Sequence, residues 1–150
     1  MGKILISHRG NINGPNPEKE NHPDYIKNAL HQGYDVEIDI WYTDKFMLGH
    51  DRPKYELSFS FLEKFYHRLW IHCKNIEALI KLKEIDPTGS KLNYFWHEKD
   101  TVTLTSKNNI WAYPGKQPIK NSIAVIPEIY ADQLTQCNGF CSDYIKNYKK

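Results

Sequence analysis

The chain has 150 residues, enough for one domain with a hydrophobic core, and its 40% hydrophobic and 25% charged residues are typical of a globular protein. A formal net charge of +2 argues against nucleic acid as a partner, and no apolar run is long enough for a signal peptide or a membrane span. Three cysteines, an odd number, argue against a disulfide framework, so we expect free thiols in a cytoplasmic protein.

Strand-like and helix-like segments alternate through the first half of the chain. Apolar residues at helical spacing after Pro23 predict a helix that ends at Gly33, and Asn75 is suited to capping a later helix. The predicted strands cover residues 4–7, 36–41 and 69–73. The predicted helices cover residues 23–33, a segment that begins at a capping box of Ser60 and Glu63, and residues 75–85.

In the second half of the chain, the pattern predicts strands that are separated by short segments. These strands cover residues 93–97, 101–105, 110–113, 122–126 and 140–142, with short helices expected up to residue 134 and over residues 143–148. Residues 98–121 leave little room for a helix. The alternation of strand and helix in the first half nevertheless indicates an α/β protein with a parallel sheet.

Two acids one residue apart mark the second predicted strand. Side chains alternate along a strand, so Glu37 and Asp39 point to the same face. Two carboxylates on one face repel each other and are costly to bury unpaired, and a divalent cation between them removes that cost. Oxygen ligands favour Mg²⁺ or Ca²⁺. The alternative is neutralisation by basic side chains: Arg9, Lys74 or Arg52.

Two histidines stand close to these acids in the expected arrangement. His8 follows the first predicted strand, and His50 follows an apolar run shortly after the second one. Beside a metal ion, two histidines supply an acid and a base for hydrolysis. The alternative is that each is an ordinary polar loop residue, because the chain has seven histidines.

The ordered set of these residues resembles the glycerophosphodiester phosphodiesterase family, within the phospholipase-C-like phosphodiesterases. The family signature is His-Arg, then Glu-x-Asp, then His-Asp, and this chain has His8-Arg9, Glu37-Ile38-Asp39 and His50-Asp51. The family's Pro-Glu-Asn element has its counterpart in Lys19-Glu20-Asn21. The resemblance is strong over residues 3–51 and weaker from there to the end.

This resemblance implies an eight-stranded barrel of the TIM type, with the active site at the carboxyl ends of the strands. Such barrels usually have about 250 residues. We therefore expect one domain over residues 1–150, a shortened TIM-like (β/α) barrel that lacks several outer helices in its second half. Residues that follow strand-like runs should share its rim: His8, Asp39, Lys74 and His97.

The resemblance also implies an enzyme that uses a metal ion to hydrolyse a small-molecule phosphodiester, releasing glycerol 3-phosphate and an alcohol. A hydroxyl of the substrate attacks phosphorus, and one of His8 and His50 takes its proton while the other protonates the leaving alcohol. Lys74 faces phosphate in the family, and Arg9 either holds a phosphate oxygen or locks Glu37.

His72 is the main departure from the family, whose members carry a further acidic metal ligand at this position. An imidazole suits Mn²⁺ or Zn²⁺ better than Ca²⁺, so Mn²⁺ and Zn²⁺ join Mg²⁺ and Ca²⁺ as candidate ions. The alternative for His72 is a hydrogen-bonded histidine in the interior. Glu20 either lines the metal site or places a negative charge at a helix N-terminus.

Two other functions stay open at this point. One is a lyase-like enzyme that stops at a cyclic phosphate, and the other is a degenerate barrel that binds a phosphate ester without turnover, which the short length and His72 favour. Aromatic residues at strand ends line a pocket or belong to the core: Trp41, Trp96, His97, Trp111 and Tyr113. None of these patterns predicts the alcohol group of the substrate or the oligomeric state.

Overall fold

The computed structural model describes residues 2–150 and is built around one mixed sheet. The ten strands of this part of the chain are β1 (Ile4–His8), β2 (Asp35–Tyr42), β3 (Phe46–Leu48), β4 (Tyr55–Glu56), β5 (Leu69–Cys73), β6 (Tyr94–Trp96), β7 (Val102–Leu104), β8 (Ile110–Ala112), β9 (Ser122–Val125) and β10 (Gly139–Ser142). The helical segments are α1 (Pro23–His31), α2 (Phe59–Phe65), α3 (Ile76–Ile85) and two short 3-10 segments, η1 (Tyr66–Arg68) and η2 (Ile145–Tyr148). Among the described residues, no helix combines the length and apolar character needed to cross a bilayer.

The strands that carry the candidate site run parallel to one another. Their order in space is β6, β5, β2, β1, β10, β9, β8, and the antiparallel strands β3, β4 and β7 extend β2 and β8. The carboxyl ends of the parallel strands therefore lie along one edge. The register along this edge places His8 beside Glu37 and Asp39 beside His72.

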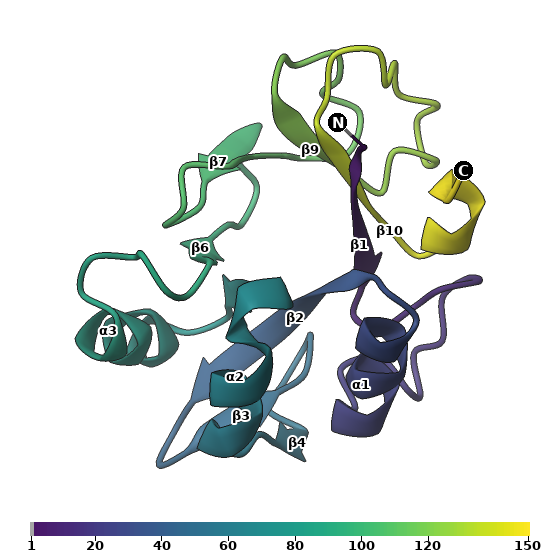
Figure 1. The fold of residues 1–150 in the computed structure, drawn as a ribbon. Helices are drawn as coiled ribbons and strands as arrows, with labels where there is room; N and C mark the ends of the chain where they lie inside the picture. Colours follow the sequence, from purple (N-terminus) through teal and green to yellow (C-terminus); the bar gives the residue numbers. More distant parts are fainter. Residues whose placement is uncertain (1) are drawn as a thin grey trace.

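The predicted TIM-like (β/α) barrel is wrong. The sheet forms a half barrel rather than a barrel of alternating strands and helices. Figure 1 shows α1, α2 and α3 gathered near β2 and β3, whereas the part of the sheet around β7 and β9 carries no α-helix. The physical reason is the content of the second half, because a barrel of this type needs a helix in each parallel crossover. The segments between β6 and β10 are occupied by turns and by the antiparallel strand β7 instead.

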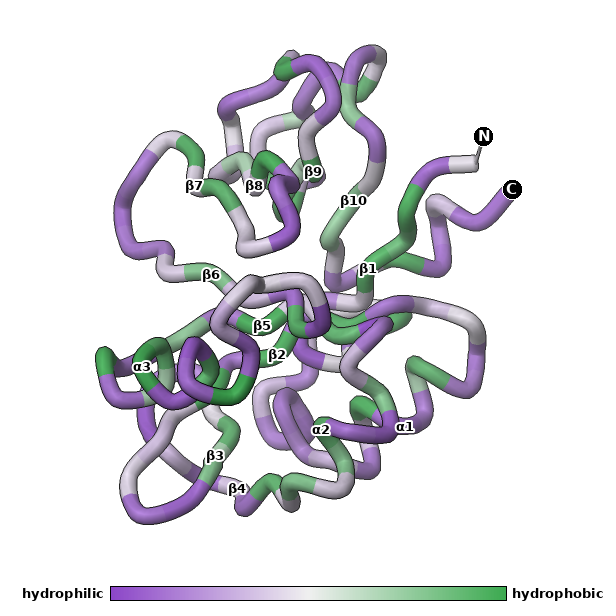
Figure 2. The backbone as a smooth tube through the Cα atoms, turned by 60° about the vertical axis from the view of Figure 1, so that its left-hand side comes forward, coloured by the Kyte–Doolittle hydropathy of each residue, from purple (hydrophilic) through white to green (hydrophobic). Residues whose placement is uncertain are grey.

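Two hydrophobic layers lie on the two faces of the sheet. On the outer face, the side chains of Val36, Ile38 and Ile40 pack with residues of α1 and α3. The inner layer consists of Ile6, Trp70, Phe95, Trp111, Ile123, Val125 and Cys141. Figure 2 shows the strands β1 and β9 as mainly hydrophobic stretches and several connecting loops as hydrophilic ones.

The inner layer forms a floor beneath polar side chains. Residues two positions apart share a face of a strand, so His8 follows Ile6, His72 follows Trp70 and His97 follows Phe95 on the inner side. The apolar residue of each pair is in the core, and the histidine lies at the carboxyl end of the strand. Strand alternation thus brings the histidines together.

The local predictions are confirmed more often than the architecture. Eight predicted strands and the helices α1 and α3 agree with the structure within two residues at each end. The capping box at Ser60 is wrong, because the Ser58 hydroxyl caps α2 by accepting from the backbone N–H of Phe61. The helix expected up to residue 134 is absent, since residues 127–131 form turns, and the last helix is the short segment η2. The short strands β3 and β4 were not predicted.

Asn75 connects the β5–α3 junction, which carries Lys74, to the neighbouring strand. Its Oδ1 accepts from the backbone N–H of Ala78 at 3.2 Å, which caps α3, and from that of Tyr42 at 3.0 Å. Its Nδ2 donates to the Tyr42 carbonyl oxygen at 2.8 Å. One side chain therefore holds both α3 and the end of β2.

We predict that Asn75→Ala lowers the free energy of unfolding by about 2–3 kcal/mol, because a lost cap costs about 1 kcal/mol and each unpaired backbone group about as much. Asn75→Asp retains both acceptor contacts and loses the donor, so its loss should be about 1 kcal/mol. Urea unfolding measures both. Asn28→Ala, in an exposed part of α1, is the control and should be near neutral. A loss in Asn75→Ala no larger than that of the control would contradict this account.

Candidate functional site

A pocket of about 300 Å³ opens at the carboxyl edge of the parallel strands. Six predicted site residues line it: His8, Arg9, Glu37, His50, His72 and Lys74. Asp39 is fully buried beside this pocket rather than in its lining. Glu20 lines a second pocket of about 240 Å³, which shares Arg9 and His50 with the first.

The two acids of β2 are both removed from solvent, with exposed fractions of 2% for Glu37 and 0% for Asp39. Burial and the neighbouring charge of Asp39 raise the pKa of Glu37 to about 7. Burial also opposes ionisation of Asp39, but the close approach of the His72 ring and the charge of Arg9 outweigh it and hold the pKa of Asp39 below its ordinary range. The pKa of Glu37 is thus raised and the pKa of Asp39 lowered, although the two residues share one strand.

Hydrogen-bond donors and a charged partner among the described residues reach one oxygen of Asp39, its Oδ2. Its Oδ2 accepts from Asn21 Nδ2 at 2.9 Å and lies 3.1 Å from Arg9 Nε. The Asn21 side chain also accepts from the Asp39 backbone N–H at 3.0 Å. In contrast, Asp39 Oδ1 and Glu37 Oε2 are buried without a hydrogen-bond donor among the described residues. Unpaired buried carboxylate oxygens are costly, and a bound cation would satisfy them.

His72 presents a nitrogen to the same two acids. Its Nε2 lies 2.7 Å from the His97 carbonyl oxygen, which only accepts, so Nε2 carries a hydrogen. In the neutral ring Nδ1 then has a lone pair, and it faces Asp39 Oδ1 at 3.2 Å and Glu37 Oε1 at 3.8 Å. A lone pair and carboxylate oxygens repel each other unless the ring gains a second proton or a cation binds between the three groups. Glu37, Asp39 and His72 each offer a ligand atom within 4.8 Å of the others.

His8 is held by a residue from the far end of the chain. Its Nδ1 lies 2.7 Å from Asp143 Oδ1, and Asn11 Nδ2 donates to the same oxygen at 2.9 Å. Its Nε2 lies 3.8 Å from Glu37 Oε2. Burial alone would lower the pKa of His8, but the hydrogen bond with Asp143 and the charge of Glu37 outweigh it, so the pKa is raised.

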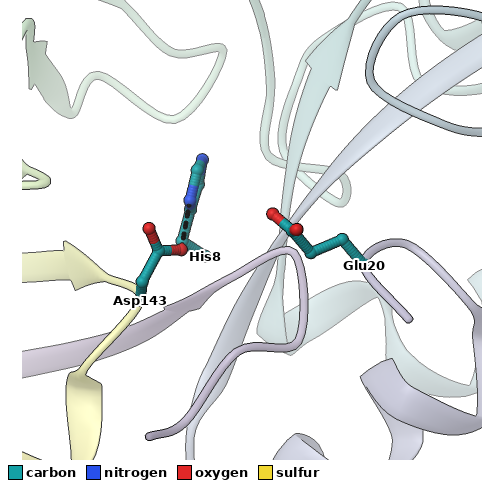
Figure 3. A group of neighbouring side chains, drawn as sticks. All are labelled: His8, Glu20 and Asp143. Atoms are coloured by element: carbon teal, nitrogen blue, oxygen red, sulfur yellow. Dashed lines mark hydrogen bonds and ion pairs between the residues drawn. The ribbon is translucent and has the colours of Figure 1, made fainter. Parts of the chain in front are cut away.

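A second group of potential ligands is explained by hydrogen bonds and charge pairing. Figure 3 shows Glu20 directed toward His8 and Asp143 from the opposite side, and these three residues have ligand atoms within 4.8 Å of one another. Asp143 Oδ1 already contacts His8 and Asn11, and Glu20 Oε1 lies 3.5 Å from Arg9 Nη1. These atoms therefore do not require a cation. Glu20, a predicted metal ligand, lies outside the Glu37–Asp39–His72 group.

His50 is placed by a tight turn after β3. Gly49 has a φ of +154°, and a Cβ at this position would lie 2.0 Å from the carbonyl oxygen of Arg52. The indole N–H of Trp41 donates to the Gly49 carbonyl oxygen at 2.6 Å, so Trp41 supports the turn and does not line the main pocket. His50 Nδ1 lies 2.7 Å from the exposed carboxylate of Asp51. Burial and the charge of Arg9 lower the pKa of His50.

The predictions for Arg9 and for the aromatic residues are partly realised. Arg9 contacts Asp39 and Glu20 rather than Glu37, and part of its side chain lines the pocket. The other aromatic candidates do line the pocket: Trp96, His97, Trp111 and Tyr113. Asp143 and Asn11 were missed. The signal for Asp143 was present, because it directly follows the last predicted strand, but it was assigned to a helix.

No protein-family model matches the chain, and comparisons with curated proteins and with solved structures also gave no match. The resemblance to glycerophosphodiester phosphodiesterases therefore stays a prediction that rests on the ordered residues themselves.

We predict that Glu37 makes the metal-free protein less stable as the pH rises. A group whose pKa rises from 4.5 to about 7 on folding favours the folded state less and less across this pH window. At about 1.4 kcal/mol per pKa unit, the full effect is up to about 3 kcal/mol. Glu37→Gln should therefore be more stable than the wild type at pH 8 and similar to it at pH 4.5, by urea unfolding in the presence of a chelator. A wild type that is the more stable of the two at pH 8 would contradict this.

Proposed function

We propose that this protein is a metal-dependent phosphodiesterase that acts on a small-molecule phosphodiester, with a glycerophosphodiester as the first candidate. The observation that carries the proposal is the arrangement of Glu37, Asp39 and His72. Asp39 Oδ1, a buried oxygen without a donor among the described residues, lies 3.2 Å from His72 Nδ1, and Glu37 Oε1 lies 3.8 Å from the same nitrogen. These three groups stand beside a pocket that two further histidines, His8 and His50, line.

The donor set of this group suits a divalent cation. Two carboxylates and one imidazole fit Mn²⁺ or Zn²⁺ as well as Mg²⁺, and they fit Ca²⁺ less well because Ca²⁺ prefers oxygen. Glu37, Asp39 and His72 would hold the ion, which would supply charge stabilisation at a phosphoryl oxygen. The His97 carbonyl oxygen orients His72 for this role by fixing the hydrogen on Nε2.

The environments of the two histidines support different roles for them. His8 is buried against Asp143, which favours its protonated form, so we assign His8 as the acid that gives the Nε2 proton to the leaving alcohol. His50 is partly exposed and its pKa is lowered, so we assign it as the base that accepts the proton of the attacking hydroxyl. Asp143 is then a positioning residue, since its carboxylate is bonded to His8 Nδ1 and Asn11 and it does not line the main pocket.

The first step of this mechanism balances within the substrate. The oxygen of a neighbouring hydroxyl bonds to phosphorus, the bond from phosphorus to the leaving alcohol breaks, and a cyclic phosphate results. Water then opens the ring while the two histidines exchange roles. Lys74 and Arg9, which line the same pocket, would pair with the non-bridging phosphate oxygens.

A metal-by-substrate screen tests the proposal. Several glycerophosphodiesters are incubated with Mg²⁺, Ca²⁺, Mn²⁺ or Zn²⁺, and products are followed by phosphorus NMR. Glycerol 3-phosphate supports the hydrolase, and accumulation of the cyclic phosphate identifies the lyase alternative. If no phosphodiester is turned over with any ion, the enzyme proposal fails. Binding without turnover then remains, and Lys74→Ala should weaken the binding of a phosphate ester.

We predict that Glu37→Gln and Asp39→Asn each lose divalent-cation binding without unfolding the chain, because each removes a charged ligand from a three-residue group. Titration calorimetry measures the affinity, and circular dichroism checks the fold. Glu84→Gln is the matched control, since Glu84 is exposed on α3 and pairs with Lys81. Unchanged affinity in both site variants would exclude a metal ion at this position.

We predict that His8→Ala lowers kcat by about 10²–10⁴-fold, the usual contribution of an acid–base group, while metal binding persists. Asp143→Asn should lower kcat less, by about tenfold or more, because it removes the charged partner of His8 Nδ1, and it should shift the pH profile. Asp44→Asn, in the exposed β2–β3 turn, is the control. Wild-type kcat and pH profile in Asp143→Asn would remove Asp143 from the mechanism.

A further inference from the structure

The main pocket has two chemically different sides. Strands β1, β2 and β5 and the segments that follow β1, β3, β5 and β6 contribute the charged and ionisable residues: His8, Arg9, Glu37, His50, His72, Lys74, His97 and Glu98. The segments that follow β8 and β9 contribute only uncharged residues: Tyr113, Pro114 and Ile126. The proposed function uses the first side and leaves the second without a role.

The uncharged side offers a wall for an apolar group. Tyr113 is 38% exposed, and its ring lies 5.2 Å from that of His97 at an interplanar angle of 60°. Beneath it, Trp111 is almost completely buried and packs on Phe95, with ring centroids 4.8 Å apart. The wall is therefore backed by a tightly packed aromatic layer.

Ile126 stands in this wall with an unusual backbone. Its φ of +43° lies in the left-handed region, where a β-branched residue is a genuine outlier. The next residue is Pro127, and a residue before proline is normally extended. Isoleucine is thus poorly suited to this position on two separate counts.

The surroundings hold Ile126 in this conformation from both sides. Its backbone N–H donates to the Cys141 carbonyl oxygen at 2.7 Å, and its carbonyl oxygen accepts from Ile129 at 3.2 Å. Its side chain packs against the inner hydrophobic layer and lines the pocket. Strained residues of this kind cluster at ligand-binding sites, where the strain places a side chain that the site needs.

We propose that Tyr113, Pro114 and Ile126 form a subsite for an uncharged apolar group, about one ring in size, carried by the leaving alcohol of the substrate. This inference rests on the proposed function for the phosphate side of the pocket. A volume of about 300 Å³, shared with the phosphate, suits a group about one ring in size. None of the three wall residues carries a negative charge that would pair with a cationic group on the substrate.

The test uses stable probes that bind without reacting, namely monoesters of methylphosphonic acid. Their alcohol is phenyl, cyclohexyl, 2,3-dihydroxypropyl or 2-(trimethylammonio)ethyl. Titration calorimetry is run with Mg²⁺ and with Mn²⁺. The affinity of the phenyl and cyclohexyl probes should be higher than that of the dihydroxypropyl probe by about tenfold or more, because only they bury an apolar ring.

We predict that Ile126→Asn removes this preference while the variant still folds, as circular dichroism checks, because relief of backbone strain offsets part of the lost apolar packing. Asparagine adopts the left-handed region more readily than isoleucine, so the variant relieves strain while it makes the wall polar. Ile129→Asn is the matched control, because Ile129 is 59% exposed and does not line the pocket. The control should keep the preference of the wild type.

Equal binding of all four probes, no binding of any probe, or tightest binding of the trimethylammonio probe would overturn the subsite. So would a preference that survives in Ile126→Asn. Hydrolysis assays on the matching phosphodiesters separate this inference from the proposed function. Ring preference in binding without any turnover supports the subsite and rejects the enzyme, whereas turnover without ring preference does the reverse.

Discussion

The burial of two carboxylates on one strand is the constraint on which the rest of this structure depends. Glu37 and Asp39 lie on β2, in the middle of the parallel strands, with exposed fractions of 2% and 0%. Burying one unpaired carboxylate costs several kcal/mol, and burying two side by side costs more. The loops before α1 supply Arg9 and Asn21, and β5 supplies His72, so the neighbouring elements act as partners for these two acids.

These partners do not satisfy the two acids equally. Asp39 Oδ2 has Asn21 and Arg9, whereas Asp39 Oδ1 and Glu37 Oε2 have no donor in the described chain. A purely structural ion pair would be expected to use both oxygens of a buried carboxylate. The free oxygen of Asp39 lies toward His72 and that of Glu37 toward His8. It is this asymmetry, rather than the acids themselves, that favours a cation over a salt bridge.

Local patterns were sufficient to predict most strands and the shared face of Glu37 and Asp39, because alternation along a strand depends only on neighbours in sequence. The barrel was wrong because closure depends on whether β6 meets β8, which no local pattern encodes. The partnership of His8 with Asp143 spans 135 positions and needs β10 to lie beside β1. A single sequence carries no direct signal for such a pairing.

Some residues at the pockets adopt backbone conformations that their residue type disfavours. Three non-glycine residues with positive φ lie at the two pockets: Arg9 at +58°, Asn21 at +64° and Ile126 at +43°. Local preference argues against this conformation at Arg9 and Ile126, so tertiary contacts must impose it. Arg9 and Asn21 are joined by a backbone hydrogen bond of 3.0 Å and converge on Asp39, while Ile126 shapes the opposite wall. Local rules are broken at functional sites more than elsewhere, and Arg9 and Ile126 both line the main pocket.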